Sequence, residues 1–219
     1  EINEQVKGLA RDIFGMGGAV PEVLIETEKG VDLQSMTKTS AWKNGEINYV
    51  GLLNEPENMH SKIEQTEATD INMLFKSKGH VYDVREKKYI GEISGNKQIE
   101  ATIFPAKAKI YSILPYKVSG VEVSTDKKNY KAGDIVKISV KIKTSNGQAG
   151  GNHVAYAEIA GPDKKVRDYY TQKVILKRGE GEIDIPTAFN DTTGIWSIIV
   201  RDVATGVSKT VDIRVTDNL

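Results

Sequence analysis

The sequence contains no cysteine, has few prolines and carries no net charge. Without cysteine, the chain forms no disulfide, no thiolate nucleophile and no cysteine-ligated metal site. Its 30 basic and 30 acidic residues balance, whereas proteins that bind nucleic acids concentrate positive charge. No apolar run approaches the roughly 20 residues of a membrane-spanning helix. We therefore expect neither a nucleic-acid partner nor a membrane span.

The residues that are present belong to an ordinary globular protein. Of the 219 residues, 39% are hydrophobic and 27% are charged, which permits a core without disulfides or metals. The length fits one large domain or two ordinary ones. The chain begins with Glu1 and shows no signal peptide. We expect a processed product or an excised part of a longer protein.

Residues 1–20 are predicted to form one α-helix and a linker. Apolar side chains recur at spacings of three, four and seven, which is typical of one helix face: Ile2, Val6, Leu9, Ile13 and Phe14. Gly15, Gly17 and Gly18 end the helix, and Pro21 cannot continue it.

Residues 21–118 are predicted to form a β-sandwich or barrel. Asn44-Gly45 is a strong turn signal, so we predict a hairpin that pairs Thr37–Trp42 with Glu46–Leu53. Short apolar strands then recur about every ten residues as far as Leu114, with turn residues between them.

Residues 119–219 are predicted to form an Ig-like sandwich without the usual cysteine pair. Between Asp134 and Lys143, four apolar side chains alternate with polar ones, as in a half-buried antiparallel strand: Val136, Ile138, Val140 and Ile142. Val166–Leu176 is predicted to hold two strands, and Trp196 to lie in the core. The predicted fold class is mostly β, with two tandem antiparallel sandwiches and one N-terminal helix.

One short motif is typical of catalysis. Asn54-Glu55-Pro56 occurs after the fourth strand of many barrel glycosidases, where its Glu is the acid/base. That chemistry needs a second carboxylate about 5–10 Å away and a barrel of about 250 residues. Because only one helix is predicted, we expect the chain not to be an enzyme.

Metal sites are not expected. His60, His80 and His153 have no metal-ligand spacing, and the cluster Glu64, Glu67 and Asp70 has no glycine turn of a calcium loop. Asn190-Asp191 leaves two alternatives open, a calcium-binding loop or ordinary turn chemistry. We expect no cofactor.

Aromatic side chains suggest a carbohydrate-binding surface, because their faces suit pyranose rings. The candidates are Trp42, Tyr49, Tyr82, Tyr89 and Trp196. Trp42 and Tyr49 are the best, because Trp42 lies next to the predicted hairpin turn.

The first half resembles the C-terminal β-sandwich of bacterial glycoside hydrolases of the β-galactosidase type. The resemblance rests on Gly79–Arg85 (GHVYDVR), Lys88–Gly91 (KYIG) and Ala108–Tyr116 (AKIYSILPY). It implies a non-catalytic accessory domain that follows a catalytic barrel, and the catalytic glutamates of that family have no counterpart in this sequence.

The second half resembles the macroglobulin-type Ig-like domains of thioester proteins and bacterial surface proteins. The similar segments are Ser124–Asp126, Tyr130–Asp134, Gly194–Trp196, Arg201-Asp202 and Thr205-Gly206. No thioester motif accompanies them, which fits a scaffold module.

Together, these features predict accessory β-sandwich modules of a larger, exported bacterial protein of the glycoside hydrolase type. The expected partner is the catalytic or assembly domain upstream in that protein. Two alternatives stay open, a carbohydrate-binding module and a surface adhesion or protein-interaction module. Export would place the protein in the periplasm, on the cell surface or outside the cell.

Overall fold

The computed structural model describes residue 9 and residues 22–26, 37–54, 68–94 and 97–217. These residues form a mostly β protein, and the one helical element among those assigned to them is the short 3-10 helix η1 (Asp168–Tyr170). The helix predicted near the N-terminus is therefore not borne out. Except for Leu9, whose side chain is 60% exposed, that prediction lies outside the described residues.

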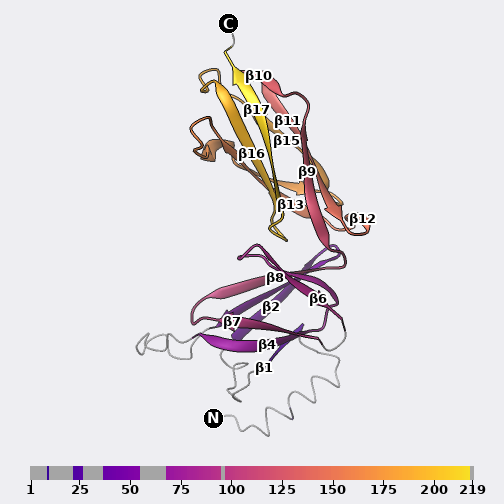
Figure 1. The fold of residues 1–219 in the computed structure, drawn as a ribbon. Helices are drawn as coiled ribbons and strands as arrows, with labels where there is room; N and C mark the ends of the chain where they lie inside the picture. Colours follow the sequence, from indigo (N-terminus) through magenta and orange to yellow (C-terminus); the bar gives the residue numbers. More distant parts are fainter. Residues whose placement is uncertain (1–8, 10–21, 27–36, 55–67, 95–96, 218–219) are drawn as a thin grey trace.

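Eight strands form two sheets in the first half of the chain (Figure 1). One sheet has the order β2-β3-β8-β5-β6 and the other has the order β1-β4-β7. The strands are β1 (Val23–Glu26), β2 (Thr37–Asn44), β3 (Ile47–Asn54), β4 (Thr69–Phe75), β5 (Gly79–Asp83), β6 (Lys88–Ile93), β7 (Gln98–Ile103) and β8 (Ala108–Leu114). All of their pairings are antiparallel.

Both sheets contribute to one apolar core, as period-two burial predicts. Its buried members are Val23, Ile25, Val50, Leu52, Ile71, Met73, Phe75, Val81, Ile93, Ile99, Ile103, Tyr111 and Ile113. The predicted hairpin is confirmed, with Asn44 paired to Ile47. Its loop is Gly45-Glu46, one residue later than predicted, because Gly45 takes the positive φ of 61° at the first loop position.

Nine strands form two further sheets in the second half (Figure 1). The order of one sheet is β10-β17-β16-β13-β14, while in the other β11 pairs with β9, β12 and β15. The strands are β9 (Val118–Thr125), β10 (Asn129–Lys131), β11 (Ile135–Thr144), β12 (Gly147–Gln148), β13 (His153–Ala160), β14 (Gln172–Leu176), β15 (Glu180–Pro186), β16 (Gly194–Asp202) and β17 (Ser208–Thr216). Figure 1 shows this second sandwich stacked end to end on the first.

Most sequence predictions for the second sandwich are confirmed. The four alternating apolar side chains of β11 are each at most 3% exposed, and Trp196 is 2% exposed. The prediction of two strands in Val166–Leu176 is wrong, because only β14 is a strand there. Val166 makes an isolated bridge to Ala160, and η1 follows it. This helical turn places Tyr170 against Trp196 in an edge contact with ring centroids 6.0 Å apart.

Among the described glycines of the first sandwich, Gly79 leaves the least room for a Cβ. Its φ is 139°, which L side chains rarely adopt, and a Cβ there would overlap the backbone carbonyl of Leu114. We expect Gly79→Ala to lower the free energy of unfolding by about 2 kcal/mol or more. Gly120→Ala is the control, because a Cβ at Gly120 meets nothing within 4 Å. Equal denaturation midpoints for the two variants would contradict this assignment.

Candidate functional site at the junction

Three residues connect the two sandwiches. β8 ends at Leu114 and β9 begins at Val118, so Pro115, Tyr116 and Lys117 are the whole linker. Tyr116 and Val118 are 5% and 4% exposed. Pro115 and Lys117 are exposed, so Tyr116 is the buried residue of the linker. A linker this short, held by a buried tyrosine, restricts the relative motion of the two sandwiches more than a long polar one would.

A chain of buried hydrogen bonds starts from the linker and runs into the second sandwich. The hydroxyl of Tyr116 lies 3.0 Å from Nε2 of His153, and Nδ1 of His153 lies 2.9 Å from Oδ1 of Asp202. Gly151 N–H donates to the Tyr116 hydroxyl at 3.1 Å, and Thr205 Oγ1 donates to Oδ2 of Asp202 at 2.6 Å. The side chains of His153 and Asp202 are completely buried.

Each polar atom of this hydrogen-bond chain has a partner inside the protein. The Asp202 carboxylate only accepts, so Nδ1 of His153 donates to it. The other nitrogen, Nε2, shares a hydrogen bond with the Tyr116 hydroxyl, whose oxygen also accepts from the Gly151 N–H. Every member of the chain is thereby satisfied, as buried polar groups require.

The arrangement of Asp202, His153 and Tyr116 has the order of an acid–base relay. Such a relay needs a reacting atom within hydrogen-bond reach of the base. The His153 side chain is 0% exposed, and both of its nitrogens already have protein partners. The hydrogen-bond chain is therefore enclosed within the junction.

Two further hydrogen bonds cross the junction directly. Ser112 Oγ of β8 donates to the carbonyl oxygen of Ala204 at 2.5 Å, and this contact is buried. The Val118 N–H donates to the hydroxyl of Tyr82 at 2.9 Å. The first bond joins a strand of one sandwich to the turn after β16 in the other, so the sheet face that carries Ser112 is covered by the second sandwich.

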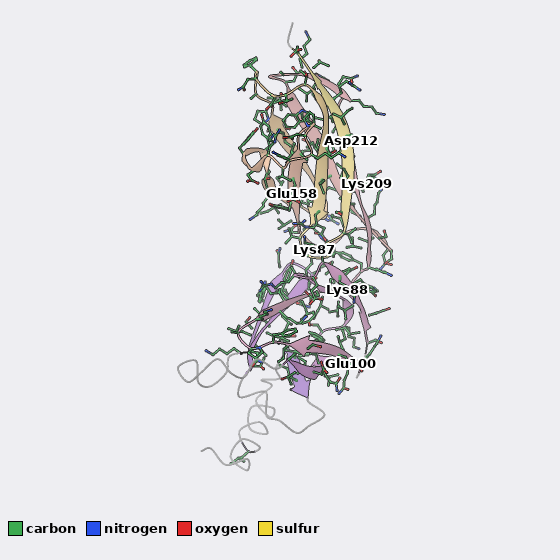
Figure 2. The ribbon with its side chains drawn as sticks, turned by 60° about the vertical axis from the view of Figure 1, so that its left-hand side comes forward. Lys87, Lys88, Glu100, Glu158, Lys209 and Asp212 are labelled. Atoms are coloured by element: carbon green, nitrogen blue, oxygen red, sulfur yellow. The ribbon has the colours of Figure 1, made fainter. Side chains whose placement is uncertain are left out.

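Close backbone approach adds to the fit. A Cβ at Gly206, whose φ is 77°, would overlap Lys87, and a Cβ at Gly150 would overlap the carboxylate of Glu46. Figure 2 shows Lys87 at the level where the two sandwiches meet. Glycine at these two positions therefore lets the loops of the second sandwich lie directly on the turns of the first.

Apolar contacts are continuous across the junction. Four buried residues of the first half of the chain and its linker belong to the core cluster of the second sandwich: Ile47, Tyr82, Leu114 and Tyr116. Tyr49 and Tyr89 pack against the same cluster. The junction thus combines buried polar and apolar contacts, as a stable interface does.

Burial changes the acidity of the tyrosines at the junction. It raises the pKa of Tyr49 and of Tyr82 to about 12, and the negative charge of Asp202 adds to both rises. Burial also raises the pKa of Tyr116, an effect that the Gly151 N–H partly offsets. These hydroxyls stay neutral until strongly alkaline pH.

The predicted sugar-stacking pair lies at the edge of this junction. Trp42 is 45% exposed, and its ring is stacked on Tyr49 with centroids 5.6 Å apart and an interplanar angle of 4°. The Trp42 ring also lies over Gly51, where a Cβ would come within 3.3 Å of it. Trp42 therefore offers an accessible aromatic surface, whereas Tyr49 packs against the junction core.

The other aromatic candidates have structural surroundings. Tyr82 is 1% and Trp196 is 2% exposed. The Tyr89 hydroxyl shares a hydrogen bond with Nδ1 of His80 at 3.0 Å. The Nζ atom of Lys117 lies 4.6 Å from the centroid of the Tyr89 ring. The structure therefore brings Trp42 and Tyr49 together and leaves the remaining aromatic residues in packing roles.

Of the remaining candidate residues, those that the structure describes do not assemble into a site. Glu55, His60, Glu64 and Glu67 lie outside the described residues. Asp191 accepts from the Tyr170 hydroxyl at 2.6 Å and from the Ala188 N–H at 2.8 Å, which is turn chemistry. Over the part of the chain that the structure describes, no group of three or more potential ligands could hold a metal ion.

Sequence reasoning missed the hydrogen-bond chain of the junction. His153 follows the glycine pair of residues 150–151, and Asp202 ends a strand that lies about 50 residues further along the chain. No local spacing connects them, because β13 and β16 become neighbours only in the folded sheet. The one available signal was the position of Asp202 before a Thr-Gly turn.

Comparisons with known proteins give distant matches only. No family model and no curated protein matches the chain. Among solved structures, a β-glucosidase from Listeria innocua matches 45% of this chain and 16% of its own, with 17% identity and a TM-score of 0.32. A Salmonella alpha-2-macroglobulin matches 84% of this chain and 12% of its own, with 14% identity and a TM-score of 0.40.

The Yersinia pseudotuberculosis adhesin InvE is similar over 83% of this chain and 59% of its own, with 10% identity and a TM-score of 0.36. This chain therefore spans less than two thirds of each of these three proteins. At these TM-scores the similarities carry no functional argument. Among the described residues, no helix is long and apolar enough to cross a membrane.

The raised tyrosine pKa values predict alkaline instability. Below pH 10 these tyrosines are protonated in both the folded and unfolded chain, so their stabilising contribution is complete. Between pH 10 and 12 the unfolded chain loses protons that Tyr49 and Tyr82 retain when folded, so stability falls. In this pH window, we expect Tyr82 to lower the free energy of unfolding by up to about 1.4 kcal/mol per pH unit.

Urea denaturation of the wild type and of Tyr82→Phe at about pH 9, 10 and 11 measures the loss of unfolding free energy with each pH unit. We expect Tyr82→Phe to be less stable at pH 9, since Val118 loses its hydrogen-bond acceptor, but to lose less stability on going to pH 11. Tyr169→Phe is the control, because Tyr169 is 71% exposed. Parallel pH profiles for the wild type and Tyr82→Phe would rule the explanation out.

Proposed function

We propose that the two sandwiches are a non-catalytic accessory unit of a larger, exported bacterial protein of the glycoside hydrolase type. In that protein they would hold the upstream catalytic or assembly domain in a fixed orientation. The unit would act as a rigid spacer, because its two parts are joined by buried contacts and not only by a chain connection.

The observation that carries the proposal is the buried junction. Ser112 donates across it to Ala204, and Val118 donates to Tyr82. The Tyr116–His153–Asp202 chain holds the linker on the second sandwich. Opening the junction would expose these groups and the shared apolar cluster together, which would cost several kcal/mol in total.

The use of potentially reactive groups favours a structural role. His153 and Asp202 are fully buried and fully hydrogen-bonded. Lys109 contacts the buried Asp83 at 3.2 Å and the exposed Glu86 at 2.8 Å. Such pairs stabilise turns and need no substrate.

Removing one junction hydrogen bond tests the proposal. Ser112→Ala leaves the buried Ala204 carbonyl without its donor, so we expect a loss of about 1–3 kcal/mol in the free energy of unfolding. Ser197→Ala is the matched control, because Ser197 donates to Asp212 on the exposed face of the second sandwich. We expect that change to stay within about 0.5 kcal/mol.

The motion of the two halves is the decisive measurement. Amide relaxation by NMR gives a rotational correlation time for each sandwich, and a rigid unit gives one common value. We expect one value for the wild type and for Ser197→Ala, and two shorter values for Ser112→Ala combined with His153→Ala. Independent tumbling of the two halves in the wild type would refute the rigid spacer.

Carbohydrate binding is the second candidate, and one observation favours it. The exposed Trp42 ring, stacked on Tyr49, has the amphipathic surface on which a pyranose ring packs. Titration calorimetry against a panel of plant and bacterial oligosaccharides tests this. We expect Trp42→Ala to weaken any binding by about tenfold or more, whereas Phe104→Ala, at another exposed aromatic residue, leaves it unchanged. No heat with any glycan in the panel would reject this function.

A further inference from the structure

Strand β2 forms an open edge of the first sandwich. It ends the sheet order β2-β3-β8-β5-β6, and among the described strands it pairs with β3 alone. Proteins usually block such an edge with proline, a bulge or a very short strand. β2 has eight residues, no proline and a regular pairing from Thr37 to Asn44, and each of its residues except Thr37 is exposed. The edge is therefore open to another strand.

The hairpin loop determines which backbone groups lie on the outer edge. In a two-residue hairpin, the residues that close the loop exchange hydrogen bonds, and every second residue of the strand then bonds to the neighbouring strand. Asn44 and Ile47 close this loop, so Asn44 and every second residue before it bond to β3. The exposed residues whose amide and carbonyl groups point away from the sheet are the ones between them: Thr39, Ala41 and Lys43.

These three residues determine how a second copy of β2 fits the edge. In an antiparallel ladder, outward-bonded residues pair with outward-bonded residues. All three are paired when a two-fold axis passes through Ala41. Ala41 then faces Ala41 of the second copy, and Thr39 faces Lys43 of the second copy. Each of these pairs exchanges main-chain hydrogen bonds across the axis.

Other positions of the axis leave outward groups without a partner. One residue nearer the start of the strand, Lys43 would face Thr37, which is only 6% exposed. Still nearer the start, Lys43 would extend beyond the second copy of the strand. One residue nearer the loop, Thr39 would face Gly45 of the turn. Two residues nearer the loop, Lys43 would face Lys43, and like charges directly opposite are unfavourable.

The side chains suit the Ala41 register. Each lysine of β2 faces a neutral residue, with Lys43 opposite Thr39 of the second copy. Trp42 faces Ser40 of the second copy, and the two Trp42 residues are diagonal neighbours, which lie about 7–8 Å apart and within reach of aromatic side chains. Pairing therefore covers part of an indole ring that is 45% exposed in the single chain.

The two-fold arrangement closes on itself. It uses the same edge of both copies, so no β2 edge remains free and the product is a pair and not a filament. The other edge strand of the sheet, β6, pairs with β5 through a register shift at Val81/Tyr82, and such an irregularity disfavours further pairing.

The arrangement also keeps the second sandwiches apart. A Cβ at Gly45 in the hairpin loop would lie 3.9 Å from the backbone of Asn152, so the loop marks the end of β2 at which the second sandwich sits. Antiparallel pairing places the two hairpin loops at opposite ends of the shared ladder. The two second sandwiches then project from opposite ends as well.

We propose that the outer edge of β2 binds the same edge of a second copy of this chain, so that the two first sandwiches share one continuous sheet in a two-fold dimer. Main-chain hydrogen bonds of Thr39, Ala41 and Lys43 hold the pair, and Trp42 adds apolar contact. One pair of strands buries less surface than a standard interface, so the dimer is weak, with a dissociation constant on the order of 100 μM. This proposal goes beyond the spacer function and does not depend on it.

Sedimentation velocity from about 10 μM to 1 mM tests for the dimer. We expect the wild type to be monomeric at the low end of this range and mostly dimeric at the high end. Ala41→Pro removes the N–H at the two-fold axis from both copies and leaves the bonds to β3 in place, a change that edge strands tolerate. We expect it to stay monomeric, whereas Ala41→Val, which keeps the N–H, dimerises as the wild type does.

A charge exchange tests the register without proline. Thr39→Lys places a lysine opposite Lys43 on both sides of the axis, so we expect it to weaken the dimer by about threefold or more. Thr39→Glu places opposite charges there and should strengthen the dimer by a similar factor. Thr39→Lys combined with Lys43→Glu should restore the affinity, because opposite charges face each other again.

Hydrogen exchange by NMR locates the interface. In dilute protein we expect fast exchange at the outer amides of Thr39, Ala41 and Lys43, and slow exchange at Ser40 and Trp42. At about 1 mM protein the three outer amides should slow by about threefold or more, while the amides of β6 keep their rates.

Four results would overturn the proposal. The first is a wild type that stays monomeric at about 1 mM. The second is a dimer whose outer β2 amides exchange as in the monomer, and the third is equal dimerisation by Ala41→Pro and Ala41→Val or by Thr39→Lys and Thr39→Glu. The fourth is slow exchange of the outer amides in dilute protein, which would mean that another segment occupies the edge. Failure of the spacer function would appear as independent tumbling of the two sandwiches, which none of these results measures.

Discussion

The burial of the last four residues of β8 on both faces is the constraint on which the rest of the structure depends. Tyr111 and Ile113 point into the core of the first sandwich, while Ser112 and Leu114 point into the junction, and all four are at most 1% exposed. A strand buried on both faces cannot shift by one residue without exchanging a serine for large apolar side chains. The register of β8 therefore fixes the first core and the docking of the second sandwich at once.

Polar groups at the junction set its geometry as well as its stability. Apolar surfaces can slide over one another at little cost, but each buried hydrogen bond is satisfied in only one arrangement. The bond from Ser112 to Ala204 joins the two sandwiches directly, while the chain through His153 holds the linker on the second sandwich. Together they restrict rotation about the three-residue linker, which a hydrophobic contact alone would permit.

Two regions of the first sandwich differ in their exposure to solvent. The half of its outer face near β8 and β5 is covered by the second sandwich, whereas β2 at the sheet edge is left exposed. Trp42 lies at the boundary between these regions, with one contact to Tyr49 on the junction side and an accessible surface on the other. The accessible ring of Trp42 therefore lies on a tyrosine that is packed against the junction core.

Sequence-based predictions were correct in segments where one side-chain periodicity or one turn motif dominated. The alternation in β11, the burial of Trp196 and the hairpin of β2 and β3 follow from side-chain period and turn chemistry alone, and the structure confirms them. The interpretation of Val166–Leu176 as two strands was wrong, because its apolar residues include Val166, which is exposed, and Tyr170, which is buried by a helical turn.

The sequence by itself determined the mostly β class, the inward faces of the clear strands and the hairpin of β2 and β3. Each of these depends on neighbours along the chain. Only the tertiary structure decided that Ser112 meets Ala204, that His153 lies between Tyr116 and Asp202, and that β2 stays at an open edge. Those outcomes depend on which distant strands become neighbours, and residues 37 to 92 positions apart carry no local signal of their pairing.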